Sequence, residues 1–520
     1  MWSHLALYNT PTLVLLGVYF TILVILSFYG SHRYMIVYLY KKFAANRPDP
    51  APERVFAPDE LPIVTIQLPM FNERYVATRL IDAVARMDYP GDRLEIQVLD
   101  DSTDDTTAIC QARVDELAAT GLDIKLIHRT DRAGYKAGAL EHGMKQARGS
   151  LVAVFDADFI PKPDFLQQTV HYFSSARVGM VQTRWEHINR EYSLLTRAQA
   201  ILLDGHFVLE HTARARSGRF FNFNGTAGIW RVDTIGDAGG WEHDTLTEDL
   251  DLSYRAQLKG WDFVFLRDVT APSEIPVEMN AFKAQQHRWA KGSIQTSLKL
   301  LPKILRADLP RFIKIEAFHH MTANLAYLLM VLLAMLMPLA TIVRVHQGLY
   351  ETLVIDLPVF LSATISICYF YWVSQREIGR ARLETLRMIP AVLGLGIGLS
   401  LNNAKAVVEA LVGYQTPFVR TPKYGINRSG ESWHRKLYIK KSTILTILEA
   451  LLGFWFTYAI VHVIFSPKGS LFSLPFLMLF QFGFFYVAAT SLFQGLGRKL
   501  FAARVSGSDV STQEPSVAGE

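Results

Sequence analysis

Long apolar runs occupy both ends of the chain and leave a more polar middle. Five runs are long enough to cross a bilayer as helices: 12–30, 320–343, 353–373, 443–465 and 471–495. Arg33, Lys41 and Lys42 follow the first run, and no Lys or Arg precedes it. The positive-inside rule therefore predicts a cytoplasmic location for the residues after this run. We interpret the run as an anchor, because it has neither the basic start nor the cleavage site of a signal peptide.

A shorter apolar segment, 388–401, is predicted not to cross the membrane. It offers about 14 apolar residues, which is short for a crossing. If it did cross, the basic segment 414–442 would lie on the outer side, against the positive-inside rule. We therefore expect 388–412 to lie flat at the interface or to be re-entrant. Five spans leave the C-terminus inside, and the polar tail 501–520 is expected to be disordered.

Residues 60–300 show a different pattern, in which short runs rich in Val and Ile alternate with amphipathic stretches. The short runs predict strands at 63–69, 94–100, 124–129 and 151–158. The stretches between them predict helices at 73–87, 104–120 and 135–147. This alternation is typical of a mostly parallel, doubly wound α/β sheet. Such sheets bind ligands beyond the carboxyl ends of their strands.

The composition excludes several classes of protein. Of the 520 residues, 50% are hydrophobic and only 19% are charged, which is too apolar for an ordinary soluble enzyme. The net charge of +5 does not indicate nucleic-acid binding, and the two cysteines cannot form a disulfide framework or a zinc site. Neither a G-x-G-x-x-G nor a Walker A sequence occurs. Two histidine pairs lack further metal ligands nearby, and we expect them to be structural or interfacial: His206 with His211, and His319 with His320.

Three acidic motifs carry candidate chemistry. Asp100 and Asp101 end the second predicted strand, where they suit either a nucleoside contact or a turn. The D-x-D motif "FDADF" (155–159) ends the fourth strand, and its two carboxylates can share Mg²⁺ or Mn²⁺ with a substrate diphosphate. The motif "TEDLD" (247–251) places acids at a helix start. These acids suit either the helix dipole or a general base.

Two further stretches have both a structural and a functional interpretation. The segment "FFNFNGTAGIWR" (220–231) fits a core strand with a turn, or a loop that lines an acceptor site. The segment "NAFKAQQHRWAKGSIQ" (280–295) precedes the second apolar run. It fits an amphipathic helix at the membrane surface, or a substrate-binding cluster.

The motifs occur together in one order, D-D, D-x-D, T-E-D, Q-x-x-R-W and then apolar helices. This order resembles the inverting family 2 glycosyltransferases with a GT-A fold, of the cellulose-synthase superfamily. The similarity is strongest to cellulose-synthase-like enzymes that build glucomannan or xyloglucan backbones, and to their bacterial relatives. It covers roughly 60–440 and includes "QLPMFNE" (67–73), "GYKAGAL" (134–140) and "QQHRW" (285–289).

The resemblance implies a role for each matching residue. Asp101, with Asp100 beside it, would contact the nucleoside, and Asp156 and Asp158 would hold the metal ion and diphosphate. Asp249 would be the general base. Arg288 would pair with diphosphate, and Trp289 would stack under the acceptor sugar. Further substrate contacts are expected from the same motifs: Lys136, Phe223, Asn224, Gly225, Thr226, Glu248 and Gln285.

The stretch "TPFVRTPKYG" (416–425) resembles the F-x-V-T-x-K gating loop of the same family. Phe418, Thr421 and Lys423 match, and the latter two are expected to contact substrate, whereas Arg420 replaces the Val. The predicted organisation has four parts: an anchor and linker (1–59), a GT-A domain (60–300), membrane helices (301–500) with a cytoplasmic interfacial helix and loop (375–442), and a tail (501–520).

The resemblance implies an integral membrane enzyme with a cytoplasmic catalytic domain. It would transfer a hexose from UDP-glucose or GDP-mannose to a growing β-linked glycan, processively and with export through its own helices. A non-processive enzyme that glycosylates a membrane lipid is the alternative, and an inactive membrane scaffold is a second one. The sequence leaves open the sugar, the linkage, the choice of Mg²⁺ or Mn²⁺, the oligomeric state and any accessory export protein.

Overall fold

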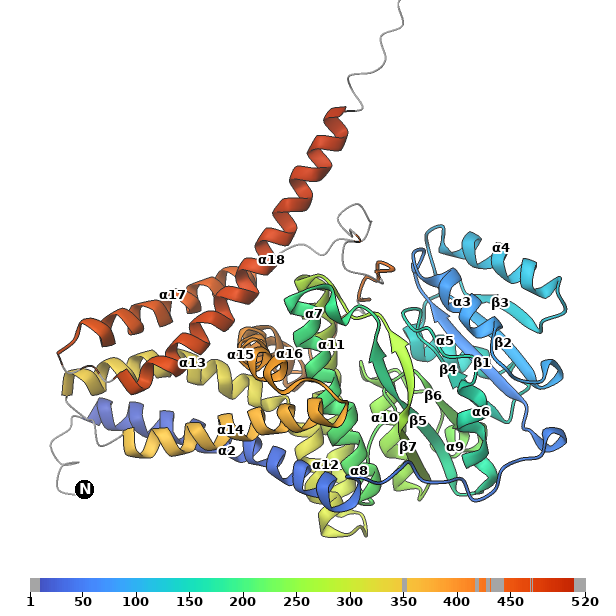
Figure 1. Ribbon diagram of the computed structural model, residues 1–520, viewed down its shortest axis with the longest axis horizontal. Coiled ribbons are helices and arrows are strands. Elements are labelled where there is room, and N and C mark those ends of the chain that lie inside the picture. The colour runs from blue at the N-terminus through green and yellow to red at the C-terminus, as the bar shows by residue number, and fades with distance from the viewer. Residues whose placement is uncertain are drawn as a thin grey trace, which may run out of the picture.

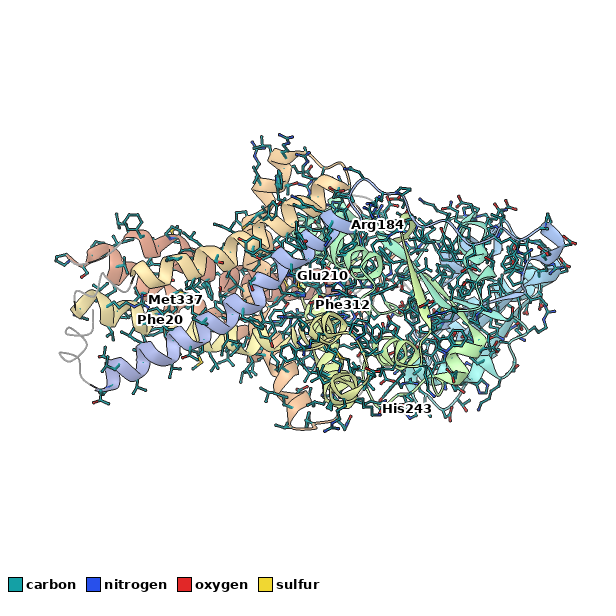
Figure 2. All side chains as sticks on the ribbon, turned by 90° about the horizontal axis from the view of Figure 1, so that it is seen from below. Phe20, Arg184, Glu210, His243, Phe312 and Met337 are labelled. Atoms are coloured by element: carbon teal, nitrogen blue, oxygen red, sulfur yellow. The ribbon has the colours of Figure 1, made fainter. Side chains whose placement is uncertain are left out.

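The chain folds into a sheet domain and a bundle of long helices that meet side by side (Figure 1). The computed structural model describes residues 10–347, 353–416, 420–426, 431, 444–467, 469 and 471–508. Seen from below, side chains labelled in the bundle, such as Met337, lie far from His243 in the sheet domain, and Glu210 lies between them (Figure 2). The fold therefore joins an α/β domain to the apolar helices.

A seven-stranded mixed sheet forms the centre of the first domain, in the order β3-β2-β1-β4-β6-β5-β7. The strands are β1 (Val64–Met70), β2 (Leu94–Asp100), β3 (Ile124–His128), β4 (Leu151–Val154), β5 (Val178–His187), β6 (Gly228–Arg231) and β7 (Asp262–Ser273). The first four are parallel to one another, as the sequence predicts. The antiparallel β6 inserts between β4 and β5, so the sheet is mixed beyond that half.

Helices cover the sheet where the sequence predicts them. The three predicted helices are α3 (Ala77–Ala85), α4 (Thr106–Ala118) and α5 (Tyr135–Met144). In α3, Leu80, Ile81 and Val84 are fully buried, because a spacing of three to four residues directs them all toward the sheet. The later helices of this domain are α6 (Phe165–Thr169), α7 (Leu194–Asp204), a π-helix (Gly205–His211), α8 (Thr212–Arg216), α9 (Val232–Asp237) and α10 (Glu248–Leu258).

The helix α11 (Met279–Arg306) connects the sheet domain to the bundle (Figure 1). The remaining helices are α2 (Thr10–Phe43), α12 (Arg311–Thr322), α13 (Leu325–Gln347), α14 (Leu353–Glu377), α15 (Arg382–Gly398), α16 (Ser400–Leu411), α17 (Ile444–Phe465) and α18 (Leu474–Ser508). The predicted domain boundary at residue 300 falls inside α11, and α18 reaches into the segment 501–520 that was expected to be disordered.

Five segments of the described chain are long and apolar enough to cross a membrane: Thr10–Phe43, Leu325–His346, Arg382–Leu411, Ile444–Phe465 and Leu471–Gln494. Four of these segments coincide with predicted spans. The fifth, 382–411, was expected from the sequence to lie at the interface, and the predicted span 353–373 is not among the five. In the most apolar 18-residue stretch of 382–411, 72% of the residues are buried, against 22–33% in the corresponding stretches of the other four segments. The segment 382–411 also breaks at Leu399, between α15 and α16. Its interfacial position stays a prediction.

The predicted span 353–373 lies within α14, which packs along α2 (Figure 1). A Cβ atom at Gly30 would lie 3.3 Å from the Cα of Ala363, so the two backbones approach closely. The hydroxyl of Ser366 also donates a hydrogen bond to the Gly30 carbonyl oxygen at 2.5 Å. Small residues and hydroxyl groups of this kind are typical of contacts between membrane helices.

Candidate active site

An open cleft lies at the carboxyl ends of β1, β2 and β4. Residues of α10, of α11 and of the segment 420–423 complete its lining. The cleft brings together most of the predicted site residues: Asp101, Lys136, Asp156, Asp158, Asn224, Gly225, Glu248, Asp249, Gln285, Arg288, Trp289, Thr421 and Lys423. Since doubly wound sheets bind ligands at this edge, the cleft is the candidate active site.

The two carboxylates of the D-x-D motif follow β4 directly, and each contacts a lysine. Asp156 pairs with the ammonium group of Lys136, and Asp158 pairs with that of Lys423. Burial alone would lower the pKa of Lys136, but nearby carboxylates, Asp156 foremost, raise it above its usual value. Two carboxylates in one cleft are hard oxygen ligands, and this donor set fits Mg²⁺ or Mn²⁺. A cation bound here would compete with the two lysines.

Asp249 lies in the first turn of α10, and its Oδ1 accepts a hydrogen bond from the Leu250 N–H at 2.8 Å. Burial and the neighbouring charge of Glu248 raise the pKa of Asp249 to about 7, although Lys136 opposes them. Gly225 packs closely against this carboxylate, because a Cβ atom there would lie 3.0 Å from Asp249 Oδ2. A carboxylate with such a pKa is suited to accept a proton near neutral pH.

The end of the cleft near β2 presents a planar platform beside a fixed carboxylate. Arg129 holds Asp101 in a bidentate pair, with Nε to Oδ1 at 2.8 Å and Nη2 to Oδ2 at 2.5 Å. The guanidinium group of Arg132 lies 3.2 Å from the ring centroid of Phe71. Stacked cationic and aromatic groups of this kind suit a planar base.

The segment 420–423 enters the cleft through two charged contacts. Lys423 contacts Asp158, and Arg420 Nη1 lies 2.7 Å from Glu73 Oε2. Burial raises the pKa of Glu73 to about 7, while Arg420 opposes this shift. The residue that departs from the gating-loop pattern thus pairs with an acid that follows β1, and the predicted Phe418 lies outside the described residues.

The helix α11 presents the Q-x-x-R-W cluster to the cleft. Gln285, Arg288 and Trp289 all line it, because a spacing of three and four residues places them on one face. Lys291 is fully buried, and its Nζ lies 3.1 Å from Glu409 Oε2 on α16. This ion pair ties the helix that carries the cluster to α16, so the cluster has a fixed backing.

Three residues that were predicted to contact substrate lie outside the lining of the cleft, and their contact with substrate stays a prediction. Asp100 is fully buried, and its Oδ2 accepts a hydrogen bond from Thr107 Oγ1 at 2.6 Å. Phe223 is fully buried among the core aromatic rings. Thr226 Oγ1 accepts a hydrogen bond from the Asp156 N–H at 2.9 Å. All three residues support the walls of the site from behind.

The lining residues that were missed include Phe71, Glu73, Arg132 and Trp185. Phe71 and Glu73 directly follow β1, so the rule that ligands bind at the carboxyl ends of strands could have identified them. Arg132 follows β3 in the same way. Trp185 lies within β5, and nothing in its local sequence distinguishes it from a core residue.

Comparison with known proteins agrees with this geometry. Residues 62–292 match the family described as "Glycosyltransferase like family 2". The chain is 45% identical over 264 residues to glucomannan 4-beta-mannosyltransferase 1 of Oryza sativa subsp. japonica, a match that covers 50% of each chain. It is 30% identical over 479 residues to glucomannan 4-beta-mannosyltransferase 7 of Arabidopsis thaliana, which covers 88% of this chain and 83% of that one.

The matches to the first relatives span about half of their length. Among solved structures, a mannosyltransferase from Pyrobaculum calidifontis, in complex with GDP-Man and Mn²⁺, has a TM-score of 0.50. It shares 20% sequence identity, over 76% of this chain and 100% of that one. This likeness shows the GT-A fold. With the family match and the extended similarity to the Arabidopsis enzyme, the chain belongs to glycosyltransferase family 2, in its cellulose-synthase-like branch.

Proposed function

We propose that this chain transfers a hexose from a nucleotide diphosphate sugar to a growing β-linked glycan, with inversion at the anomeric carbon. The observation that carries the proposal is the placement of Asp249, whose pKa is raised to about 7, in one cleft with Asp156, Asp158, Arg288 and Trp289. The similarity to mannosyltransferases, one of them solved with GDP-Man, favours GDP-mannose over UDP-glucose as the donor.

The donor would bind with its base on the Arg132–Phe71 platform and its diphosphate near the D-x-D motif. Asp156 and Asp158 would hold a divalent cation, which supplies positive charge to the leaving diphosphate when bound. Arg288 and Lys423 add fixed positive charge in the same cleft. Cationic groups placed in advance stabilise a developing anion without reorganisation at the moment of reaction.

Asp249 would remove the proton from the acceptor hydroxyl as that oxygen attacks the anomeric carbon. Attack from the face opposite the leaving diphosphate converts an α-linked donor into a β-linked product. The acceptor sugar would rest on Trp289, since the apolar face of a pyranose matches an indole ring. Asn224 and Gly225, which also line the cleft, would complete the acceptor side.

The apolar helices support an enzyme integrated in a membrane, with the cleft on the cytoplasmic side as the basic residues indicate. A processive enzyme would release its product through the bundle. A lipid acceptor is the second candidate. One observation favours it: a cavity between α2, α13, α14, α15 and α18 is lined mostly by apolar side chains, such as Leu333, Ile397 and Phe480.

The experiment combines donor choice with product stereochemistry. The purified full chain in lipid nanodiscs receives GDP-mannose or UDP-glucose with a β-linked manno-oligosaccharide, in Mg²⁺ or Mn²⁺. We expect transfer from GDP-mannose, a new linkage that NMR shows to be β-configured, and a glycan product that does not partition into organic solvent. An α-linkage would contradict the mechanism, and a product that partitions into organic solvent would favour the lipid acceptor.

A further inference from the structure

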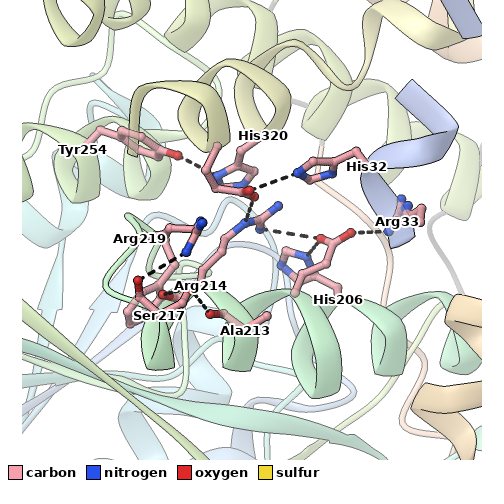
Figure 3. Close-up of polar contacts among 12 residues, drawn as sticks. His32, Arg33, His206, Ala213, Arg214, Ser217, Arg219, Tyr254 and His320 are labelled. Atoms are coloured by element: carbon pink, nitrogen blue, oxygen red, sulfur yellow. Dashed lines mark hydrogen bonds and ion pairs between the residues drawn. The ribbon is translucent and has the colours of Figure 1, made fainter. Parts of the chain in front are cut away.

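A continuous set of polar contacts runs from the acceptor side of the cleft to the first membrane helix. Asn224, which lines the cleft, donates from Nδ2 to His206 Nε2 at 3.0 Å. The other ring nitrogen of His206, Nδ1, lies 3.0 Å from Glu210 Oε2. Glu210 in turn pairs with Arg33 of α2 (Figure 3). The proposed mechanism uses Asn224 and leaves the other three residues without a role.

The donor and acceptor pattern of these contacts fixes one tautomer of His206. Burial alone would raise the pKa of Glu210, but Arg33 and Arg214 hold this pKa well below its usual range. Glu210 is therefore a carboxylate, which only accepts hydrogen bonds. His206 must therefore carry its proton on Nδ1. Nε2 then serves as the acceptor for the Asn224 amide, and both contacts are satisfied at once.

The local backbone explains how His206 can reach in both directions. His206 and Glu210 belong to the π-helix, and insertions of this type are frequent at functional sites. The π-helix begins at Gly205, where a Cβ atom would lie 2.6 Å from a ring carbon of Phe370 on α14. It therefore packs tightly against the membrane helices, and its position depends on theirs.

The membrane side of the set is held at two neighbouring points of α2. Arg33, besides pairing with Glu210, lies 4.5 Å from the ring centroid of Phe370. His32 Nε2 lies 3.0 Å from Glu316 Oε2, and Glu316 Oε1 accepts from Arg214 Nε at 2.8 Å (Figure 3). Arg214 lies 3.6 Å from Glu210, which closes the set. Buried charges paired in this way are costly to rearrange, so the set is rigid.

We propose that His206 is a positioning residue for glycosyl transfer, which holds the Asn224 side chain in place on the acceptor side of the cleft and is itself oriented by Glu210 and Arg33 of the first membrane helix. The proposal rests on the proposed function in one respect, the acceptor role of Asn224. It gives α2 a part in the geometry of the active site, in addition to its part as an anchor.

Two conservative substitutions separate the two contacts of His206. In His206→Gln, the side-chain oxygen occupies the place of Nε2 and still accepts from Asn224, but the contact to Glu210 is lost. In His206→Asn, the amide nitrogen occupies the place of Nδ1 and still donates to Glu210, but the contact to Asn224 is lost. The two variants are therefore matched controls for each other.

The kinetic test uses the full chain in nanodiscs with GDP-mannose and a β-manno-oligosaccharide acceptor. We expect His206→Asn to lower kcat/KM for the acceptor about tenfold and to leave the KM for the donor unchanged, as expected for one lost hydrogen bond. His206→Gln should stay within about threefold of the unsubstituted enzyme on both measures. Equal losses in both His206 variants, or a donor KM that changes as much as the acceptor parameter, would overturn the proposal.

Hydrogen–deuterium exchange gives a readout that does not need activity. The peptide 220–230 should exchange faster in His206→Asn than in His206→Gln, at equal thermal stability. Should the unsubstituted chain transfer no sugar from any donor, the proposed function fails, and the exchange data alone decide on the contact. Equal exchange in the two variants would then overturn the positioning role.

Discussion

The pH dependence of transfer tests the assignment of Asp249 most sharply. Burial and the charge of Glu248 raise the pKa of Asp249 to about 7. With that pKa, about one tenth of the enzyme carries the ionised base at pH 6 and about nine tenths at pH 8. Because a base acts only when ionised, kcat/KM should fall about tenfold from its plateau by pH 6.

Two substitutions check this interpretation. Asp249→Asn should lower kcat by about 10²- to 10⁴-fold at every pH, which is the usual contribution of a general base. Glu248→Gln removes the like charge that raises the pKa of Asp249, so the fall of kcat/KM on the acidic side of the pH profile should move to lower pH. The assay measures the initial rate at which the nucleoside diphosphate is released in the presence of acceptor, from pH 5 to pH 9. A pH profile that does not move in Glu248→Gln, or an Asp249→Asn enzyme with normal activity, would refute the reasoning.

Three further predictions concern the residues around the base. Lys423→Met removes the cation that contacts the second D-x-D carboxylate, so Mn²⁺ should bind more tightly in the absence of donor, by calorimetry, while transfer falls about tenfold. Gly225→Ala should abolish most transfer, because the positive φ of 81° and the carboxylate of Asp249 both oppose a side chain at this position. Gly260 is the matched control: its φ is 91° but the space around it is open, so Gly260→Ala should lower stability and leave transfer unchanged. Arg420→Val removes the cation that pairs with the buried Glu73, so the pKa of Glu73 should rise further. A carboxyl group whose pKa is raised in the folded state destabilises the protein as the pH rises through that pKa, so the loss in Tm should be larger at pH 8 than at pH 5.5.

The sequence predicted the parallel half of the sheet well for a physical reason. The strands β1, β2 and β4 are buried along almost their whole length and are rich in Val, Ile and Leu, and their bounds lie within one to a few residues of the predicted ones. Polar residues such as Gln67 and Gln97 interrupt the apolar pattern of β1 and β2, but they too are buried. The carboxyl ends of parallel strands meet at one edge, which is why Asp101, Asp156 and Asp158 could be placed together before any coordinates were known. Asp249 was proposed as the base from the order of motifs rather than from its local pattern.

Other features depend on contacts between segments that are distant in the sequence. The pairing of Arg420 with Glu73 joins the loop to β1, and no local pattern predicts it. Asp100 and Phe223 have the residue types of a binding site, but the fold turns the first toward Thr107 and the second into the core. The π-helix that presents His206 has no clear signal either, because it differs from an α-helix by the packing of its surroundings.

The central claim is that one cleft joins a nucleotide sugar to a glycan with Asp249 as the base. Its most direct test supplies GDP-mannose, UDP-glucose or UDP-N-acetylglucosamine in turn to the full chain in nanodiscs, with Mg²⁺ or Mn²⁺, and measures product length and linkage beside Asp249→Asn. The account predicts a long β-linked glycan, from GDP-mannose, that the variant does not make. A full-length product from the variant, or no transfer from any of the three donors, would contradict it.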